Sequence, residues 1–199
     1  MDGMGLPGME DYGLTRLWLL RHGETEWSRS GQYTGLTDLP LTALGEEQAR
    51  SARTTLDGVD FGLVLTSPLQ RARRTAELAG FPDAQPEPNA VEWDYGDYEG
   101  VRSADIRKEN PDYLIWDDGV PNGETLEHVG ERADRIVQRV RTAGVENALV
   151  VAHGHFCRIL AARWLELPAA SGRHFILGTA QACRLGWDKK TPAVEAWGL

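Results

Sequence analysis

The sequence LWLLRHGETEW, residues 17–27, joins a short apolar run to a polar segment that begins at Arg21 and His22. Such a run is typical of a buried strand in a parallel sheet, although a buried helical turn has a similar composition. In open α/β sheets the carboxyl ends of the strands bind ligands. Gly23 allows the backbone to turn sharply and to approach a ligand closely. The Arg21–His22 pair is therefore a candidate site, and a core histidine beside a surface arginine is the alternative.

The composition is typical of a soluble globular protein, with 41% hydrophobic and 26% charged residues. A chain of 199 residues is expected to form a single domain at 14–199, after a flexible tail at 1–13. The sequence has neither an apolar run long enough for a membrane span nor a signal peptide, so we expect no membrane association and a cytoplasmic location. Cys157 and Cys183 lie in apolar segments and are expected to be buried free thiols.

The formal net charge of −9 argues against nucleic-acid binding, which normally uses a basic surface. It does not exclude a local cationic site. Only three of the 21 basic residues are lysines, so an anion site in this chain would be built from arginine and histidine. Guanidinium groups suit phosphate because they donate two parallel hydrogen bonds. The sequence leaves open whether the chain forms a homodimer.

Apolar runs and helical periodicities alternate along the chain, which predicts an α/β fold with a mostly parallel sheet. We expect strands at 17–20, 63–66, 148–152, 180–187 and 193–197. Helices are expected at 42–56, from Ser67-Pro68 to Gly80, at 102–110, at 126–140 and at 156–164. Two long connections, 24–41 and 111–125, are expected to be functional loops, because loops of this length are uncommon in compact domains.

Three junctions that follow expected strands carry Arg21 and His22, Arg71, and His153, so the fold should bring these residues to one edge of the sheet. Arg71 falls in the first turns of its helix, where a cation is disfavoured unless an anion is present. Phosphoryl transfer needs such cations, a nucleophile and an acid for the leaving oxygen. Neutral histidine can be the nucleophile. The candidate acids are Glu92, Asp94, Asp97 and Glu99.

Four segments, RHGETEW, SPLQRARRTAEL, VEWDYGDYEG and VVAHGHFCR, resemble the successive motifs of the histidine phosphatase, or phosphoglycerate-mutase-like, superfamily. The match spans residues 17–165, and four motifs in the right order are far more specific than an isolated RHG. The resemblance implies a three-layer α/β/α sandwich and no metal or organic cofactor. It also implies that His22 is phosphorylated, that Arg21, Arg71 and His153 complete a phosphate pocket, and that Glu92 is the proton donor.

The same resemblance suggests further substrate- or phosphate-binding residues. Thr34 and Gly35 would lie against the phosphate, and Ser28 takes a place where the mutases usually have asparagine. Tyr95 matches a substrate-side position of the mutases, and Gly154 belongs to the last motif. His155 has two open interpretations, a substrate-lining role and a helix-capping role.

Within the superfamily, the chain looks most like the branch of sedoheptulose-1,7-bisphosphatase and bacterial mutase-like acid phosphatases. Residues 100–123 lack the adjacent arginines with which mutases hold the substrate carboxylate, and the chain is shorter than typical mutases. Both features favour a metal-independent phosphatase acting on small phosphomonoesters, including sugar phosphates or bisphosphates.

Three alternatives remain open at this point. A cofactor-dependent phosphoglycerate mutase would use the same phosphohistidine chemistry, and Tyr95 is its best support. A metal-dependent hydrolase would use His153 and His155 as a zinc pair, but no acidic residue adjoins them and arginines would repel a dication. The third alternative is a protein that binds phosphate or phosphohistidine without catalysis. It is disfavoured because the chain contains every reacting group that the family needs.

Overall fold

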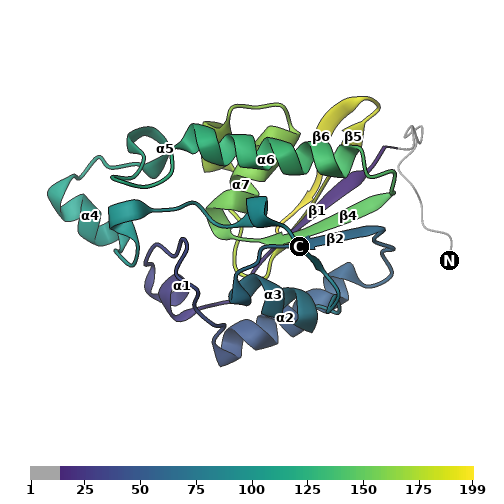
Figure 1. Cartoon of the computed structure of the whole chain (residues 1–199), viewed down its shortest axis with the longest axis horizontal. Helices are drawn as coiled ribbons and strands as arrows, with labels where there is room; N and C mark the ends of the chain where they lie inside the picture. The colour runs from purple at the N-terminus through teal and green to yellow at the C-terminus, as the bar shows by residue number, and fades with distance from the viewer. Residues whose placement is uncertain (1–13) are drawn as a thin grey trace.

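The described part of the chain, residues 14–199 of a computed structural model, is built around one six-stranded sheet (Figure 1). The strand order is β3-β2-β4-β1-β5-β6. The strands are β1 (Arg16–Arg21), β2 (Leu63–Thr66), β3 (Gln85–Pro86), β4 (Asn147–Ala152), β5 (Ala182–Asp188) and β6 (Thr191–Trp197). The first four run parallel, and β5 and β6 add an antiparallel edge beside β1. The predicted α/β fold with a mostly parallel sheet is confirmed.

Side chains of β1 alternate between two hydrophobic layers, one on each face of the sheet. Leu17 and Leu19 belong to the larger core cluster, whereas Trp18 and Leu20 belong to the smaller one. This alternation follows from the two-residue period of a strand, and it explains why the run is apolar at every position. The apolar segment at residues 17–20 is therefore a central strand covered on both faces.

Helices cover both faces and produce the three layers implied by the resemblance. They are α1 (Glu26–Ser30), α2 (Ala43–Leu56), α3 (Gln70–Leu78), α4 (Ser103–Glu109), α5 (Ile115–Asp118), α6 (Leu126–Arg141) and α7 (Gly154–Trp164), with 3₁₀ turns η1 (Pro88–Ala90), η2 (Gly96–Tyr98) and η3 (Ala169–His174). α6 and α7 pack on the larger core cluster, and α2 and α3 on the smaller one. Figure 1 shows α6 above the sheet and α2 and α3 below it.

Two sequence-based expectations need correction, and two others are not tested. The helix expected to begin at Ser67-Pro68 begins at Gln70, because the Ser67 hydroxyl bonds to the Leu69 amide and to His153 instead of capping the helix. The Asp38 carboxylate, in the first connection, accepts a hydrogen bond from the backbone amide of Gln70. The connections at 24–41 and 111–125 contain the short helices α1 and α5. The tail expected at residues 1–13 lies outside the described residues, and the single domain at 14–199 stays a prediction.

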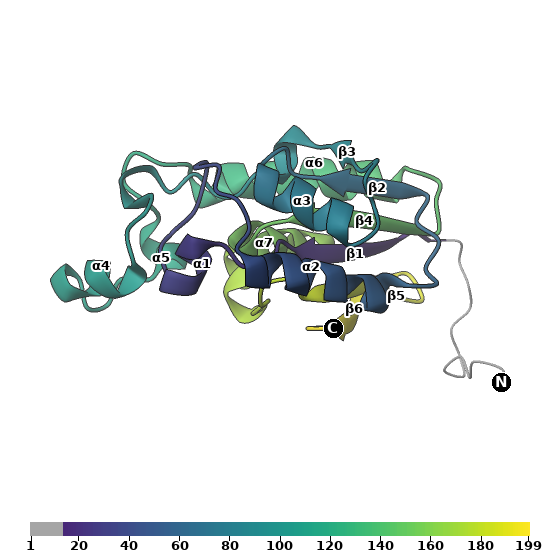
Figure 2. The same cartoon turned by 90° about the horizontal axis from the view of Figure 1, so that it is seen from below.

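The additional helices gather where the parallel strands end. α1, α4 and α5 lie beyond the carboxyl ends of these strands in both views (Figure 1) (Figure 2). Among residues 14–199, no helix is long and apolar enough to cross a membrane. The ends of β1 and β4 are thus enclosed by loops and short helices, which is the arrangement expected for a site at this edge.

The first turn of α2 presses directly on the backbone that follows β1. A Cβ atom on Gly45 would lie 2.1 Å from the carbonyl oxygen of Glu24, and one on Gly23 would lie 2.2 Å from the carbonyl oxygen of Gly45. Since backbone atoms line both sides of this contact, no side-chain rotation relieves a clash. Both glycines are therefore needed for the path of the chain next to His22.

We predict that Gly45→Ala lowers the free energy of unfolding by about 1–3 kcal/mol, the usual cost of overpacking, despite the higher helix propensity of alanine. Gly130→Ala in α6 is the matched control, since its Cβ would meet only the Cβ of Ala169, at 3.2 Å. The control is expected to change stability by less than about 1 kcal/mol, the scale of the propensity difference. Urea unfolding of both variants measures this, and equal effects would contradict the proposed backbone contact.

Candidate active site

His22 directly follows β1 and has one ring nitrogen engaged by the protein and one left free. Nδ1 lies 2.7 Å from the carbonyl oxygen of Gly23. Because a carbonyl oxygen only accepts hydrogen bonds, Nδ1 carries the proton. No hydrogen bond from residues 14–199 engages Nε2. Burial lowers the pKa of His22 well below 6.5, and Arg71 and Arg21 lower it further. The ring is therefore neutral near pH 7 and presents the Nε2 lone pair as a nucleophile.

Arg71, in the first turn of α3, is fully buried. Its Nε donates to Nδ1 of His153 at 3.1 Å. Its two terminal nitrogens donate to carbonyl oxygens of the first loop, those of Thr34, Gly35 and Thr37. None of the ion pairs in the described part of the chain includes Arg71. Burial lowers its pKa, but an arginine stays charged at any physiological pH. Arg71 is thus a buried cation without a carboxylate partner.

Arg21, at the end of β1, is a second cation without a carboxylate partner among residues 14–199, and it is only partly buried. Its Nη1 donates to the carbonyl oxygen of Leu177 at 2.7 Å, while its Nε is buried without a hydrogen-bond partner among the described residues. A Cβ on Gly154 would lie 3.3 Å from the guanidinium, so the glycine lets the start of α7 approach Arg21 closely. Buried polar groups are almost always paired, and Arg21 lines the cleft together with His22, so Arg21 is a candidate for binding an anion there.

His153 lies between Arg71 and His22, at the N-cap of α7. Nδ1 accepts from Arg71, so the proton is on Nε2, which lies 2.7 Å from the Ser67 hydroxyl. The ring centroids of His22 and His153 are 5.2 Å apart. Burial, followed by the charge of Arg71, lowers the pKa of His153 well below 6.5. The structure thus brings His153 to the site, where both of its ring nitrogens contact protein groups.

Glu92 is buried, and its carboxyl group faces the first turn of α7. Oε1 accepts from the amides of Trp93 and Phe156, both at 2.9 Å, and Oε2 accepts from the amide of His155 at 3.0 Å. Burial raises the pKa of Glu92 above its ordinary value, although these amides and Arg71 oppose the shift. Desolvation therefore exceeds the opposing effects, a balance that the sequence alone left open. A raised pKa suits a carboxyl group that must donate a proton.

The carboxylates of the other three candidate acids form hydrogen bonds to protein groups outside the cleft. Asp94 accepts from the amide of Gly96 at 3.0 Å, and Asp97 accepts from the Asn122 side chain at 2.8 Å. Glu99 accepts from the amides of Gly35 and Thr37, which supports the loop whose carbonyl groups hold Arg71. None of the three lines the cleft that contains His22, whereas Glu92 does.

Tyr95 and His155 form part of the wall of the cleft that contains His22. The Tyr95 hydroxyl lies 2.6 Å from Nδ1 of His155, and the His155 ring also contacts Trp93 and Trp116. Burial lowers the pKa of His155 to about 3, so its ring is neutral. The ring lines the cleft, and only its backbone amide bonds to Glu92. Of the two interpretations of His155, the structure favours the substrate-lining one.

The first loop supplies Ser28 and Thr34 to the cleft, but not Gly35. The Ser28 hydroxyl belongs to the capping box of α1, where it bonds to Thr25. The Gly35 amide is taken by Glu99, and a Cβ at Gly35 would lie 2.6 Å from that carboxylate and from the carbonyl oxygen of Trp93. The role of Gly35 against the phosphate stays a prediction. The Gly35 carbonyl group holds Arg71.

The cleft has a volume of about 250 Å³, which suits a small substrate. Its lining comprises Arg21, His22, Ser28, Gly31, Gln32, Tyr33, Thr34, Glu92, Tyr95, Gly154, His155, Arg158, Ile176 and Leu177. Three larger surface hollows, of about 740, 870 and 380 Å³, contain neither His22 nor Glu92. The chemistry is thus concentrated in the smaller hollow.

Sequence analysis missed Arg158 and Leu177. Arg158 stacks over Trp116, 4.8 Å from the ring centre, and donates to the carbonyl oxygens of Gly172 and Arg173. Its place one helical turn after Gly154 was a usable signal, because that spacing puts both residues on one face of α7. Leu177 contributes a backbone carbonyl group, for which a sequence gives no signal.

His153 and His155 do not converge on one point. His153 bonds to Arg71 and Ser67, while His155 bonds to Tyr95. Within residues 14–199 there is no group of three or more histidine, cysteine or acidic side chains that could hold a metal ion. The interpretation of these histidines as a zinc pair thus has no structural support.

Comparison with known proteins agrees with this geometry. The family model of the histidine phosphatase superfamily (branch 1) matches residues 17–199. The chain is 39% identical to an acid phosphatase of Mycobacterium tuberculosis over 92% of both chains. It is 37% identical to the sedoheptulose 1,7-bisphosphatase of Saccharomyces cerevisiae, over 76% of this chain and 68% of that protein.

Solved structures give the same assignment. A functionally characterised open reading frame of Mycobacterium tuberculosis superposes with a TM-score of 0.88 at 39% identity, covering 93% of this chain and 97% of the other. A mycobacterial glucosyl-3-phosphoglycerate phosphatase in complex with VO₃ superposes with a TM-score of 0.81 at 27% identity, covering 92% and 98%. The chain is thus an enzyme of the histidine phosphatase superfamily, branch 1, and its named relatives here are phosphoric monoester hydrolases.

Proposed function

We propose that this enzyme is a metal-independent phosphatase that hydrolyses small phosphomonoesters through a phosphohistidine on His22. The observation that carries the proposal is the state of His22: Nδ1 donates to Gly23, and Nε2 is free, beside two guanidinium groups that lack carboxylate partners. Arg21 lines the cleft with His22, and the charges of both arginines reach the His22 ring and lower its pKa, so they would also attract a phosphate group toward Nε2. The arginines supply the positive charge that a metal ion supplies in other phosphatases.

The proposed reaction has two steps, transfer of the phosphoryl group to His22 and hydrolysis of the phosphohistidine. Nε2 of His22 forms a bond to phosphorus while the bond from phosphorus to the ester oxygen breaks, and Glu92 donates its proton to that oxygen. Water then attacks the phosphohistidine, Glu92 takes a proton from it, and the histidine–phosphorus bond breaks to release phosphate. Arg21 and Arg71 stabilise the charge on the phosphoryl oxygens in both steps.

The alternative, a phosphoglycerate mutase, would need cations that hold the substrate carboxylate. The three basic residues between Gly100 and Gly123 are engaged elsewhere. Arg102 and Lys108 pair with Asp105, and Arg107 bonds to the carbonyl oxygen of Tyr113. None of them lines the cleft. Tyr95, the best support for a mutase, bonds to His155. These contacts favour hydrolysis over transfer to a phosphoglycerate.

The substrate class follows from the cleft and from the relatives. The residues that line the cleft include the aromatic Tyr33 and Tyr95 and the apolar Ile176 and Leu177. The relatives include an acid phosphatase and a sedoheptulose 1,7-bisphosphatase. We propose sugar phosphates and bisphosphates as the first substrates to test. The buried free thiols of Cys157 and Cys183 support a reducing, cytoplasmic compartment.

A panel of phosphomonoesters tests the proposed function. The panel includes sugar bisphosphates and 3-phosphoglycerate, each with and without 2,3-bisphosphoglycerate, and the protein is first treated with EDTA. We expect release of inorganic phosphate that survives EDTA and disappears in His22→Ala, because the nucleophile is lost. Isomerisation of 3-phosphoglycerate that depends on the bisphosphate would support the mutase instead, and loss of activity in EDTA with recovery in zinc would contradict metal-independent chemistry.

A second prediction concerns the acid. Glu92→Gln should lower kcat for an alkyl or sugar phosphate by about two or more orders of magnitude, the usual scale of general acid catalysis. p-Nitrophenyl phosphate should be affected much less, because its phenolate leaves readily without a proton. Steady-state kinetics on both substrates measures the ratio. Equal losses would exclude Glu92 as the acid.

The dependence of activity on pH, compared between the wild type and Glu92→Gln, tests the same assignment independently. Activity requires neutral His22, so it falls as the pH drops through the lowered pKa of His22, below 6.5. Activity also requires protonated Glu92, so it falls as the pH rises through the raised pKa of Glu92, above 4.5. Glu92→Gln is expected to remove the basic limb and to keep the acidic one. A basic limb that persists in this variant would assign it to another group.

A further inference from the structure

Arg132 of α6 is a buried arginine whose guanidinium lies beneath the segment that carries Glu92. It is 6% exposed. Its terminal nitrogens donate to the carbonyl oxygens of Asn89 at 2.6 Å, Val91 at 3.0 Å and Glu92 at 3.4 Å. Residues 87–95 contain only the 3₁₀ turn η1, so no strand or α-helix fixes their backbone. Arg132 supplies much of the hydrogen bonding that regular structure would otherwise provide.

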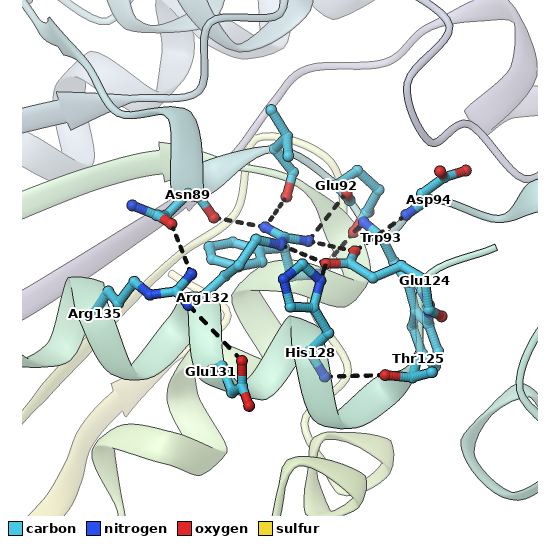
Figure 3. Close-up of polar contacts among 12 residues, drawn as sticks. Asn89, Glu92, Trp93, Asp94, Glu124, Thr125, His128, Glu131, Arg132 and Arg135 are labelled. Atoms are coloured by element: carbon cyan, nitrogen blue, oxygen red, sulfur yellow. Dashed lines mark hydrogen bonds and ion pairs between the residues drawn. The ribbon is translucent and has the colours of Figure 1, made fainter.

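Glu124 neutralises Arg132 and is itself tied to the same segment (Figure 3). The two side chains form a bidentate pair, with both nitrogen–oxygen distances at 2.7 Å. The Glu124 backbone accepts from the indole N–H of Trp93 at 2.7 Å and donates to the carbonyl oxygen of Asp94 at 2.9 Å. On its outer side the carboxylate meets Nδ1 of His128 at 2.6 Å. The Glu124–Arg132 pair therefore forms hydrogen bonds to the backbone or side chains of residues directly before and directly after Glu92 in the sequence.

Arg132 also contacts the element that receives the Glu92 carboxyl group. Its guanidinium carbon lies 5.0 Å from the ring centre of Phe156, whose amide donates to Oε1 of Glu92. One side chain thus contacts both the backbone before the acid and a residue of α7 that holds its carboxyl group. A displacement of Arg132 would shift Glu92 relative to the start of α7 and to His22.

We propose that Arg132, neutralised by Glu124, is the positioning residue of the general acid: it holds the Glu92 carboxyl group in line with the leaving oxygen. This inference rests on the proposed role of Glu92. Arg132 does not line the cleft and touches no substrate, so it acts through Glu92 alone. Residues that orient the ligands of a metal ion without contacting the metal commonly contribute about 10- to 100-fold, and we expect the same scale for a residue that orients a carboxyl group.

The chain offers a matched control on the same helix. Arg139 lies two turns further along α6 and pairs with buried Glu87, while also bonding to the side chain of Gln85. It anchors the beginning of the same segment, but it contacts neither Glu92 nor Phe156. Arg139 itself is exposed and only its partner Glu87 is buried. If both ion pairs merely stabilised the fold, loss of either arginine would lower kcat on an alkyl phosphate and on p-nitrophenyl phosphate in the same proportion.

The test is a double-mutant cycle between Arg132 and Glu92, read on an alkyl phosphate and on p-nitrophenyl phosphate. Arg132→Gln should lower kcat on the alkyl phosphate about 10- to 100-fold, with little change in KM and a much smaller loss on p-nitrophenyl phosphate. In a Glu92→Gln background the same change should have almost no further effect, because the acid is already lost. Arg139→Gln should leave the ratio of the two substrates unchanged.

Arg132→Lys covers the case in which Arg132→Gln folds poorly. The lysine keeps a positive charge opposite Glu124, but one ammonium group cannot bond to that carboxylate and to three carbonyl oxygens at once. It should show the same selective loss on the alkyl phosphate. Equal losses on both substrates, or equal losses with and without Glu92, would overturn the inference while leaving the role of Glu92 intact. A Glu92→Gln variant without leaving-group dependence would overturn both.

Discussion

Two guanidinium groups without carboxylate partners in the described structure, that of buried Arg71 and that of partly exposed Arg21, are the constraint on which the site depends. Removing a charge from water is costly unless other groups replace the hydration, and a carboxylate is the usual partner. At Arg71 the replacements are carbonyl oxygens of the first loop, and at Arg21 the carbonyl oxygen of Leu177. Carbonyl dipoles orient the cations but leave their net charge available. An incoming phosphate dianion can therefore supply the missing counter-charge.

The rest of the active site keeps other groups neutral around these cations. Burial and the arginines lower the pKa values of His22 and His153, and burial raises that of Glu92. These shifts suit opposite tasks, since a histidine nucleophile must be unprotonated and a general acid must be protonated. Glu99 contributes indirectly, because it holds the loop whose carbonyl groups surround Arg71. The position of Arg71 thus depends on the first loop, and the position of that loop depends on Glu99, which follows Glu92 in the chain by seven residues.

The sequence predicted the sheet and the residues at its edge because strong local signals marked them. Continuous apolar runs ending in Arg21-His22 and in His153 are specific, and β1 and β4 follow them closely. The weaker predictions failed where distant residues decide local structure. Ser67 looked like a helix cap, yet its hydroxyl bonds to His153, which is 86 residues away. The sequence likewise contains no indication that the Glu99 carboxylate, 64 residues away, accepts a hydrogen bond from the Gly35 amide. The carbonyl group of Leu177 and the side chain of Arg132 could not be assigned from their own neighbours, since their roles arise only from tertiary contacts.

The position of the phosphoryl group on the trapped enzyme tests the central claim most directly. The hydrogen bond from Nδ1 to Gly23 leaves Nε2 of His22 as the only ring nitrogen able to attack phosphorus. Alkaline quenching during turnover, followed by ³¹P NMR and peptide mapping, distinguishes the two phosphohistidine isomers and identifies the residue. We expect an acid-labile, base-stable phosphoryl group on Nε2 of His22. A phosphoryl group on Nδ1, on His153 or on His155 would contradict the account.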